Sequence, residues 1–136
     1  MSYLLDTNVC IALMNGNSEK VRSLYARAVL VGIPLATSSI CMHELWYGVE
    51  KSSQQDRNSR KLRSFIAEDI EVLNFSNEDA LAAAQIRAEL ERKGTRIGEY
   101  DTLIAGQALA RQITLVTANT REFNRIPGLH VEDWNA

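Results

Sequence analysis

The stretch Tyr3-Leu4-Leu5-Asp6-Thr7-Asn8 decides how the rest of this chain is interpreted. Its apolar run ends abruptly in a carboxylate, and from Val9 onward the apolar residues recur at helical spacing. The pattern predicts a short strand and then a helix, with Asp6 at the carboxyl end of the strand. In open parallel sheets, this edge is where ligands bind. Other residues that reach the same edge are therefore candidates for a functional site.

Strands and helices alternate along the remainder of the chain. Strand patterns follow at 34–38, 70–75, 113–117 and, as an edge strand, 129–134. Helical patterns cover 8–15, 18–31, 39–49, 62–66, 77–92 and 102–111, whereas 51–60 begins as a polar, turn-like segment. This order predicts an α/β protein whose parallel sheet is covered by helices on both faces. Right-handed crossovers would bring the strand ends to one edge, together with Ser38, Ser39 and the segment 117–119.

The composition fits a single globular domain over residues 1–136. Hydrophobic residues make up 46% of the chain and charged residues 24%. No apolar run approaches the roughly 20 residues of a membrane span, and Asp6 interrupts the first apolar stretch too early for a signal peptide. We therefore expect a cytoplasmic protein without a membrane segment. Cys10 and Cys41 lie in apolar helical patterns without metal-ligand spacing, which indicates reduced core residues.

The net charge of −2 does not indicate a generic nucleic-acid binder. Basic residues do gather in two segments, which are interpreted as solvated helix faces. The first holds Arg57, Arg60, Lys61 and Arg63, and the second holds Arg92, Lys93 and Arg96. A role with nucleic acid must therefore come from chemistry elsewhere in the chain.

Three acids are expected to meet at the sheet edge. Asp6 follows the first strand, Glu44 lies about one turn into the helix after the second, and Asp101 is in the first turn of the helix after Gly98. Carboxylates with no His or Cys at ligand spacing select Mg²⁺ or Mn²⁺ over zinc. Such a cation clamps a phosphate and activates water, so hydrolysis of a phosphodiester is the natural reaction. Helix capping is the alternative role for any one of these acids, least so for Glu44 on its largely apolar helix.

Four segments then resemble a known family in their order and spacing. They are Leu4–Asn8, His43–Gly48, Ile97–Ala105 and Leu115–Phe123. Together they resemble the PIN-domain ribonuclease toxins of the VapC type, from bacterial toxin–antitoxin pairs. The resemblance covers essentially the whole chain, including the closing segments 127–129 and 132–134.

The resemblance implies a fold, an activity and partners. The fold would be a three-layer α/β/α sandwich around a mainly parallel sheet of four to five strands. The activity would be that of an Mg²⁺-dependent endoribonuclease, with Mn²⁺ as a substitute, acting on tRNA or another structured RNA to block translation. Asp6 and Asp101 would be the main metal ligands, and Glu44 would complete the metal shell or orient the attacking water. The toxin would be a homodimer, held inactive in a larger assembly by a small VapB-type antitoxin whose tail enters the active-site groove.

One position departs from the family pattern. Many PIN domains have a fourth acid just after the fourth strand, where this chain has Asn119. An amide can hydrogen-bond a metal-bound water but adds no charge, so one or two metal ions are both compatible with the sequence. Glu99 is an additional acid before Asp101, and it is either solvent-facing or an accessory metal contact.

Further polar residues near this edge have secondary roles in the prediction. Asn119, Thr7, Asn8 and Thr117 would position a water or a phosphate, with local capping an equal alternative for the last three. Arg121 and Arg125 are the candidates for contacts to RNA phosphates. His43 points along a different helix bearing from Glu44 and is predicted to be structural, whereas His130 in the tail strand is predicted to have a surface or edge role. Trp46 and Tyr47 cannot both face the core, so one of them is expected to meet a partner.

Two other functions were compatible with the fold but are disfavoured. A non-catalytic PIN-fold binding module would have no need to keep three mutually repelling carboxylates. A metal-dependent phosphohydrolase on a non-RNA substrate, working through an aspartyl intermediate, usually has a second acid where this chain has Asn8.

Overall fold

The computed structural model describes residues 1–136 and contains five strands and seven helices. In chain order these are β1 (Tyr3–Leu5), α1 (Thr7–Asn15), α2 (Glu19–Val31), β2 (Leu35–Ser38), α3 (Ser39–Glu50), α4 (Gln55–Ile66), β3 (Ile70–Leu73), α5 (Asn77–Arg92), α6 (Glu99–Arg111), β4 (Thr114–Val116), α7 (Thr120–Phe123) and β5 (Val131–Glu132). This alternation confirms the α/β class that the sequence predicts.

All five strands are parallel, in the order β3-β2-β1-β4-β5. The first strand of the chain is therefore the central one, which explains why Leu4 and Leu5 are both fully buried. Leu5 pairs with Thr37 of β2 and with Val116 of β4, so these three strands end within one residue of one another. The segments that follow these strands therefore leave the sheet at one common edge.

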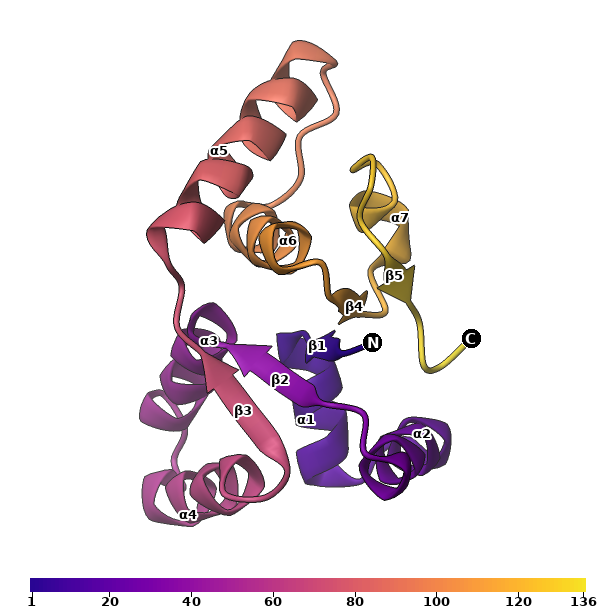
Figure 1. Cartoon of the computed structure of the whole chain (residues 1–136). Helices are drawn as coiled ribbons and strands as arrows, with labels where there is room; N and C mark the ends of the chain where they lie inside the picture. Colours follow the sequence, from indigo (N-terminus) through magenta and orange to yellow (C-terminus); the bar gives the residue numbers. More distant parts are fainter.

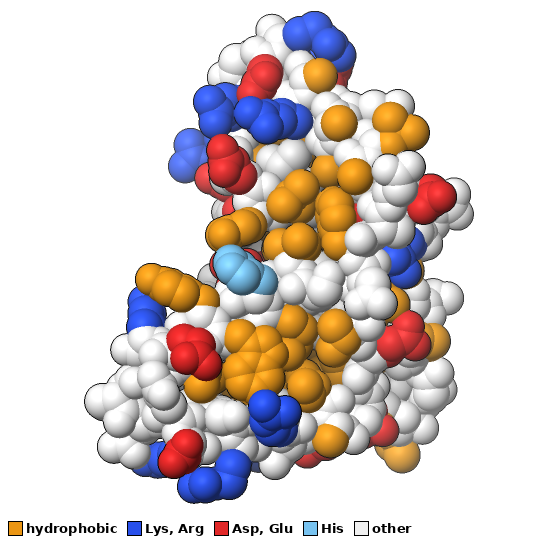
Figure 2. Space-filling model, turned by 90° about the vertical axis from the view of Figure 1, so that its left-hand side faces the viewer, with side chains coloured by type: hydrophobic (Ala, Val, Ile, Leu, Met, Phe, Trp, Pro, Cys, Tyr) orange, Lys and Arg blue, Asp and Glu red, His pale blue; other side chains and the backbone are white.

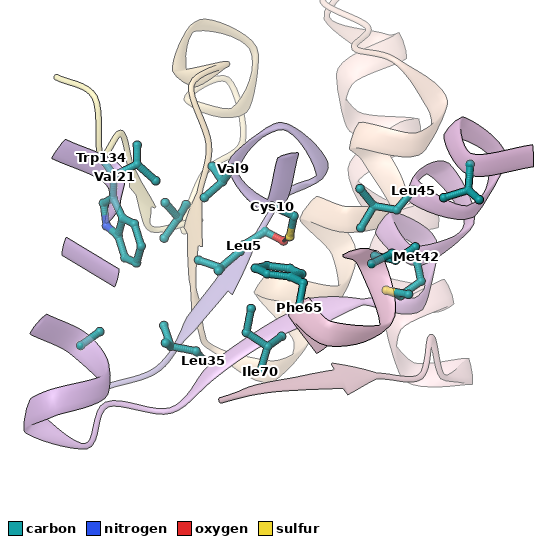
Figure 3. Packing of buried hydrophobic residues seen from close by; sticks show 14 residues of the cluster. Leu5, Val9, Cys10, Val21, Leu35, Met42, Leu45, Phe65, Ile70 and Trp134 are labelled. Atoms are coloured by element: carbon teal, nitrogen blue, oxygen red, sulfur yellow. Dashed lines mark hydrogen bonds between the residues drawn. The ribbon is translucent and has the colours of Figure 1, made fainter. Parts of the chain in front are cut away.

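Helices cover both faces of the sheet, as predicted (Figure 1). Helices α1, α2 and α4 lie on one face, α5, α6 and α7 on the other, and α3 starts directly from the end of β2. Because side chains alternate along a strand, Leu5 packs into the core under α1, α2 and α4, whereas Leu4 packs under α5 and α6. Figure 3 shows the first of these cores, with Leu5 beside Cys10 of α1 and Phe65 of α4.

The boundaries of two helices differ from the prediction. Helix α4 begins at Gln55, seven residues before its first buried residue, Leu62. Its first two turns are polar and mostly exposed and have no side-chain cap, so they carry no apolar periodicity to detect. Helix α6 begins at Glu99, directly after Gly98, so Asp101 lies in its first turn as expected.

A buried ion pair fixes α6 against the start of α5. Asp79, in the first turn of α5, is 1% exposed, and both of its carboxylate oxygens accept from the Arg111 guanidinium, at 3.0 and 3.3 Å. Arg111 also donates to the Asn74 carbonyl, and Ser76 forms a reciprocal capping box with Asp79. Burial by itself raises the pKa of Asp79, but the hydrogen bonds and charge of Arg111 and the bonds from Ser76 outweigh it, and the pKa is lowered.

Two smaller expectations can also be compared with the fold. Cys10 and Cys41 are free and buried, which confirms them as reduced core residues. None of the helices combines the length and apolar character needed to cross a membrane.

Candidate functional site

Asp6 is held rigidly where β1 ends. It is the N-cap of α1, and one of its carboxylate oxygens accepts from the backbone N–H of Val9 at 3.1 Å. The other accepts from the hydroxyl of Thr117, which follows β4, at 2.5 Å. The residue is only 8% exposed. Burial, joined by the negative charge of Glu44, raises the pKa of Asp6 despite these hydrogen bonds.

Glu44 reaches the same edge from α3. It is half-buried in the second turn of that helix, and its Oε1 accepts from the hydroxyl of Thr7 at 2.8 Å. Thr7 is the first residue of α1, next to Asp6 in the chain. Adjacent residues of one segment therefore tie together the end of β1 and the helix that carries Glu44.

Asp101 completes the predicted trio from α6. Its Oδ2 accepts from the Asn119 side-chain amide at 3.3 Å. Burial raises the pKa of Asp101, and so do the negative charges of Glu122, Asp6 and Glu44. The charges of Asp6, Glu44 and Asp101 thus act on one another across a shared space, as the sequence interpretation required.

Glu122 is a fourth acid that sequence reasoning missed. It lies in the short helix α7, and its Oε2 accepts from the same Asn119 amide at 3.1 Å. Asn119 therefore bridges the carboxylates of Asp101 and Glu122. The signal was available, because Glu122 follows Asn119 by three residues, one helical turn, in a segment already expected to form a helical turn. Although Asn119 is neutral, this part of the edge does carry an acid.

No cation of the protein neutralises these four acids. The chain has four ion pairs, Arg87–Glu91, Arg92–Glu89, Lys93–Glu89 and Arg111–Asp79, and none includes an acid of this edge. The donor set consists of carboxylate oxygens, which suits a hard divalent cation. No three His, Cys, Asp or Glu side chains already stand at mutual ligating distance. That spacing is expected of like charges that repel one another.

The residues with predicted secondary roles make different contacts in the structure. Thr7 and Thr117 bind carboxylates directly. Asn8 is exposed and acts on Asp6 through its backbone N–H. Arg125 uses one guanidinium nitrogen to bind the carbonyls of Thr95 and Arg96, at 3.4 and 3.1 Å, and so holds the loop that enters α6.

Arg121 and Glu99 are both exposed, as solvent-facing residues would be. Trp46 is half-buried with Arg63 over its ring at 4.9 Å, whereas its neighbour Tyr47 is 60% exposed. Trp46 is thus the aromatic residue that packs inward. His43 is exposed rather than buried, and its ring contacts the ring of Tyr100.

A hollow of about 310 Å³ adjoins Glu44 between α1, α3 and α4. Half of its lining is hydrophobic, with Ile11 and Met14 from α1 and Leu45 and Val49 from α3. Lys61 of α4 stands at its margin and donates to the Asn15 side chain at 2.6 Å. The acidic edge therefore continues into a partly apolar groove.

Comparison with known proteins agrees with this geometry. The family model for the PIN domain matches residues 3–129. The chain is 44% identical to the tRNA(fMet)-specific endonuclease VapC of Salmonella typhimurium, over 98% of each chain. It is 41% identical to ribonuclease VapC2 of Rickettsia felis, over 99% of each. Its fold matches the crystal structure of VapBC2 from Rickettsia felis bound to a promoter DNA fragment, with a TM-score of 0.92, 39% identity and coverage of 98% and 99% of the two chains.

Proposed function

The chain belongs to the PIN-domain family as a VapC-type ribonuclease toxin, and from that premise we propose that it is an Mg²⁺-dependent endonuclease of tRNA. The observation that carries this proposal is the set of four carboxylates, Asp6, Glu44, Asp101 and Glu122, that face one another without a cation. Initiator tRNA is the proposed substrate. The support is full-length identity of 44% and 40% to two proteins named tRNA(fMet)-specific endonucleases, from Salmonella typhimurium and Shigella flexneri.

Each acid has a distinct part in the proposed metal site. Asp6 and Asp101 would be the main ligands, because both carry raised pKa values that a nearby cation would relieve. Glu44 and Glu122 would complete the shell or accept a proton from the attacking water. When bound, Mg²⁺, or Mn²⁺ in its place, polarises the scissile phosphate and makes a bound water more acidic.

The neutral residues of the edge keep these carboxylates in position. The Thr117 and Thr7 hydroxyls restrict the rotamers of Asp6 and Glu44, and the Asn119 amide fixes the separation of Asp101 and Glu122. Such positioning lowers the cost of ordering the site when ligands bind. Arg121, exposed just beyond β4, is the proposed contact to an RNA phosphate.

We further propose that a VapB-type antitoxin restrains the enzyme. Solved relatives include VapBC complexes from Rickettsia felis and Salmonella typhimurium. Glu44 lines the partly apolar groove between α1, α3 and α4, so an antitoxin segment seated there would contact one acid of the edge. We also propose a homodimer, as expected for this family, and a cytoplasmic location, where tRNA is found.

Cleavage of tRNA by the purified, antitoxin-free chain tests the proposal. A mixed tRNA pool and isolated tRNA(fMet) would be incubated with Mg²⁺, with Mn²⁺ and with chelator, alongside the Asp6→Asn variant. The expected result is cleavage of tRNA(fMet) that requires a metal and is lost in the variant. Cleavage of other tRNAs with equal efficiency would overturn the substrate assignment. No cleavage of any RNA would favour a binding module, and release of phosphate from small phosphomonoesters would favour a phosphohydrolase.

A further inference from the structure

Two exposed aromatic rings lie on the helices that carry Glu44 and Asp101. Tyr100 precedes Asp101 in the first turn of α6 and is 47% exposed. His43 precedes Glu44 on α3 and is also exposed. The two rings contact each other edge to face, with centroids 5.6 Å apart and planes at 61°. Each ring belongs to the residue that precedes a proposed metal ligand in the chain, and it points along a different helix bearing from that ligand.

The aromatic surface continues along α3. Tyr47 follows His43 by four residues, so the two side chains share one face of the helix. Tyr47 is 60% exposed, and the Lys51 ammonium lies 5.1 Å from the centre of its ring. Lys51 forms no ion pair with any carboxylate of the chain. Two contacting pairs, His43 with Tyr100 and Tyr47 with Lys51, are thus joined by one face of α3, and together they are named the aromatic strip.

The surface of the protein is hollowed next to these elements. Viewed from the side of α3, α4 and α5, the outline is notched between the part that holds α5 and α6 and the part that holds α3 and α4 (Figure 2). The contact between His43 and Tyr100 bridges α3 and α6, the two helices on either side. The paired rings therefore join the helix that carries Glu44 to the helix that carries Asp101.

The chemistry of the aromatic strip suits unpaired nucleotides. Exposed aromatic rings stack with bases of any sequence, and an unpaired lysine contacts the phosphate backbone. Trp46 offers a contrast on the same helix, because its ring is half-buried and already covered by the Arg63 guanidinium. Core packing explains Trp46, but it does not explain three neighbouring rings left in solvent.

We propose that the aromatic strip is the subsite for unpaired bases of the RNA substrate that flank the scissile phosphate. Tyr100, with His43 against it, stacks on the base nearest the acids. Tyr47 takes the next base, and Lys51 contacts a phosphate farther along the strand. This proposal rests on the proposed ribonuclease function and names the part of the RNA that the protein holds: single-stranded nucleotides rather than a duplex.

The test measures RNA binding separately from cleavage. The probe is a single-stranded 12-mer RNA with a central 2-aminopurine, whose fluorescence changes when the base stacks. Binding would be measured with Mg²⁺ in the cleavage-deficient Asp6→Asn protein, alone and combined with Tyr100→Ala, Tyr100→Phe or Leu30→Ala. Leu30 is a matched control because it is an 85% exposed apolar residue on α2, outside the aromatic strip.

Loss of the Tyr100 ring should weaken binding about tenfold and abolish the fluorescence change, because one stacked base is lost. Tyr100→Phe should stay within about twofold, since it keeps the ring, and Leu30→Ala should have no effect. In the cleavage-competent protein, Tyr100→Ala should raise KM for tRNA and change kcat by less than about threefold. This split separates base binding from damage to Asp101.

Three results would overturn the proposal. One is unchanged RNA affinity of Tyr100→Ala, and a second is equal loss in Tyr100→Phe. The third is conversion of a dimer to a monomer by Tyr100→Ala in light scattering, which would make the strip an interface between two copies of the chain. Absence of metal-dependent cleavage by the unmodified protein would overturn the proposed function instead, and that result is read from a different assay.

Discussion

Asp6 and Asp79 are both buried carboxylates at the start of a helix, yet their surroundings are opposite. Asp79 is 1% exposed and is bound by Arg111, Ser76 and the amide of Gln107, so its pKa is lowered. Asp6 is 8% exposed and is bound only by neutral donors, so burial, joined by the charge of Glu44, raises its pKa despite those hydrogen bonds. Asp79 is paired with a cation of the same chain, Arg111, whereas Asp6 forms no ion pair.

Under the proposed function, this difference separates a structural acid, Asp79, from a functional one, Asp6. A buried charge is costly unless it is paired, and Asp79 is paired by its own chain. At the sheet edge the fold instead gathers Asp6, Glu44, Asp101 and Glu122 with no basic side chain among them. We propose that a partner from outside, a divalent cation, completes that arrangement. The following predictions test this contrast, beginning with the largest effect.

Asp6→Asn should reduce RNA cleavage by more than about a thousandfold, because removal of a carboxylate that holds the metal removes most of the transition-state stabilisation. Asp101→Asn should behave alike. Cleavage of tRNA by the purified variants measures this, and circular dichroism checks that the fold is intact. Asp79→Asn is the matched control, and it should cleave at the normal rate per folded molecule. Turnover retained by either variant of the edge would exclude that residue from the metal site.

Asp79→Asn should lower the free energy of unfolding by about 2 kcal/mol. The change breaks a buried charge pair, but Arg111 is one-third exposed and can recover hydration, which reduces the usual cost. Urea denaturation followed by circular dichroism measures it. In metal-free protein, Asp6→Asn should cost much less, since it removes an unpaired charge. Equal losses for the two variants would remove the distinction between the two acids.

The stability gap between the original protein and Asp79→Asn should depend on pH. Because folding lowers the pKa of Asp79 from its ordinary value of 3.8, its ionised form stabilises the fold above that value. The difference in free energy of unfolding should have its full value near neutral pH. It should shrink as the pH falls below 3.8 and through the lower pKa of the folded state. Denaturation curves collected at several pH values would show it. A gap that widens in acid would reverse the assigned direction.

Mn²⁺ should stabilise the folded protein through the acidic edge. At a free concentration tenfold above its dissociation constant, a single ion adds about 1.4 kcal/mol. Thermal unfolding with and without Mn²⁺ measures the shift, which Asp79→Asn should retain and Asp6→Asn should lose. Stabilisation of all three proteins to the same extent would place the ion elsewhere.

Asn119→Asp should have the smallest effect. The new carboxylate would face Asp101 and Glu122, to which the present amide donates. It should destabilise metal-free protein slightly, tighten Mn²⁺ binding a few-fold and keep kcat within about threefold. Calorimetry measures the stability and the Mn²⁺ affinity, and a tRNA cleavage assay measures kcat. Complete loss of cleavage would show that the amide has a specific role of its own.

The sequence was informative wherever one residue carried a strong local signal. The apolar run that ends at Asp6 predicted the central strand, and the alternation of elements predicted the parallel sheet and the edge where Asp6, Glu44 and Asp101 meet. The polar first turns of α4 gave no periodicity, so its start was missed.

Contacts between distant segments were beyond the reach of sequence patterns. Nothing local indicates that Thr7 binds Glu44, 37 residues away, or that Thr117 binds Asp6 across 111 residues. Likewise, His43 and Tyr100 meet only because α3 and α6 flank the same edge. Glu122 was not predicted, because the family pattern has its fourth acid at the position of the neutral Asn119. The acid of this chain instead lies one helical turn later and accepts a hydrogen bond from the Asn119 side-chain amide.

Direct titration of Mn²⁺ into metal-free protein, followed by electron paramagnetic resonance, tests the central claim most directly. The unmodified chain and Asp79→Asn should bind Mn²⁺ stoichiometrically with the same affinity, whereas Asp6→Asn and Asp101→Asn should bind it at least about tenfold more weakly. Undiminished binding by Asp6→Asn would contradict the claim that the unpaired carboxylates of the sheet edge form the metal site.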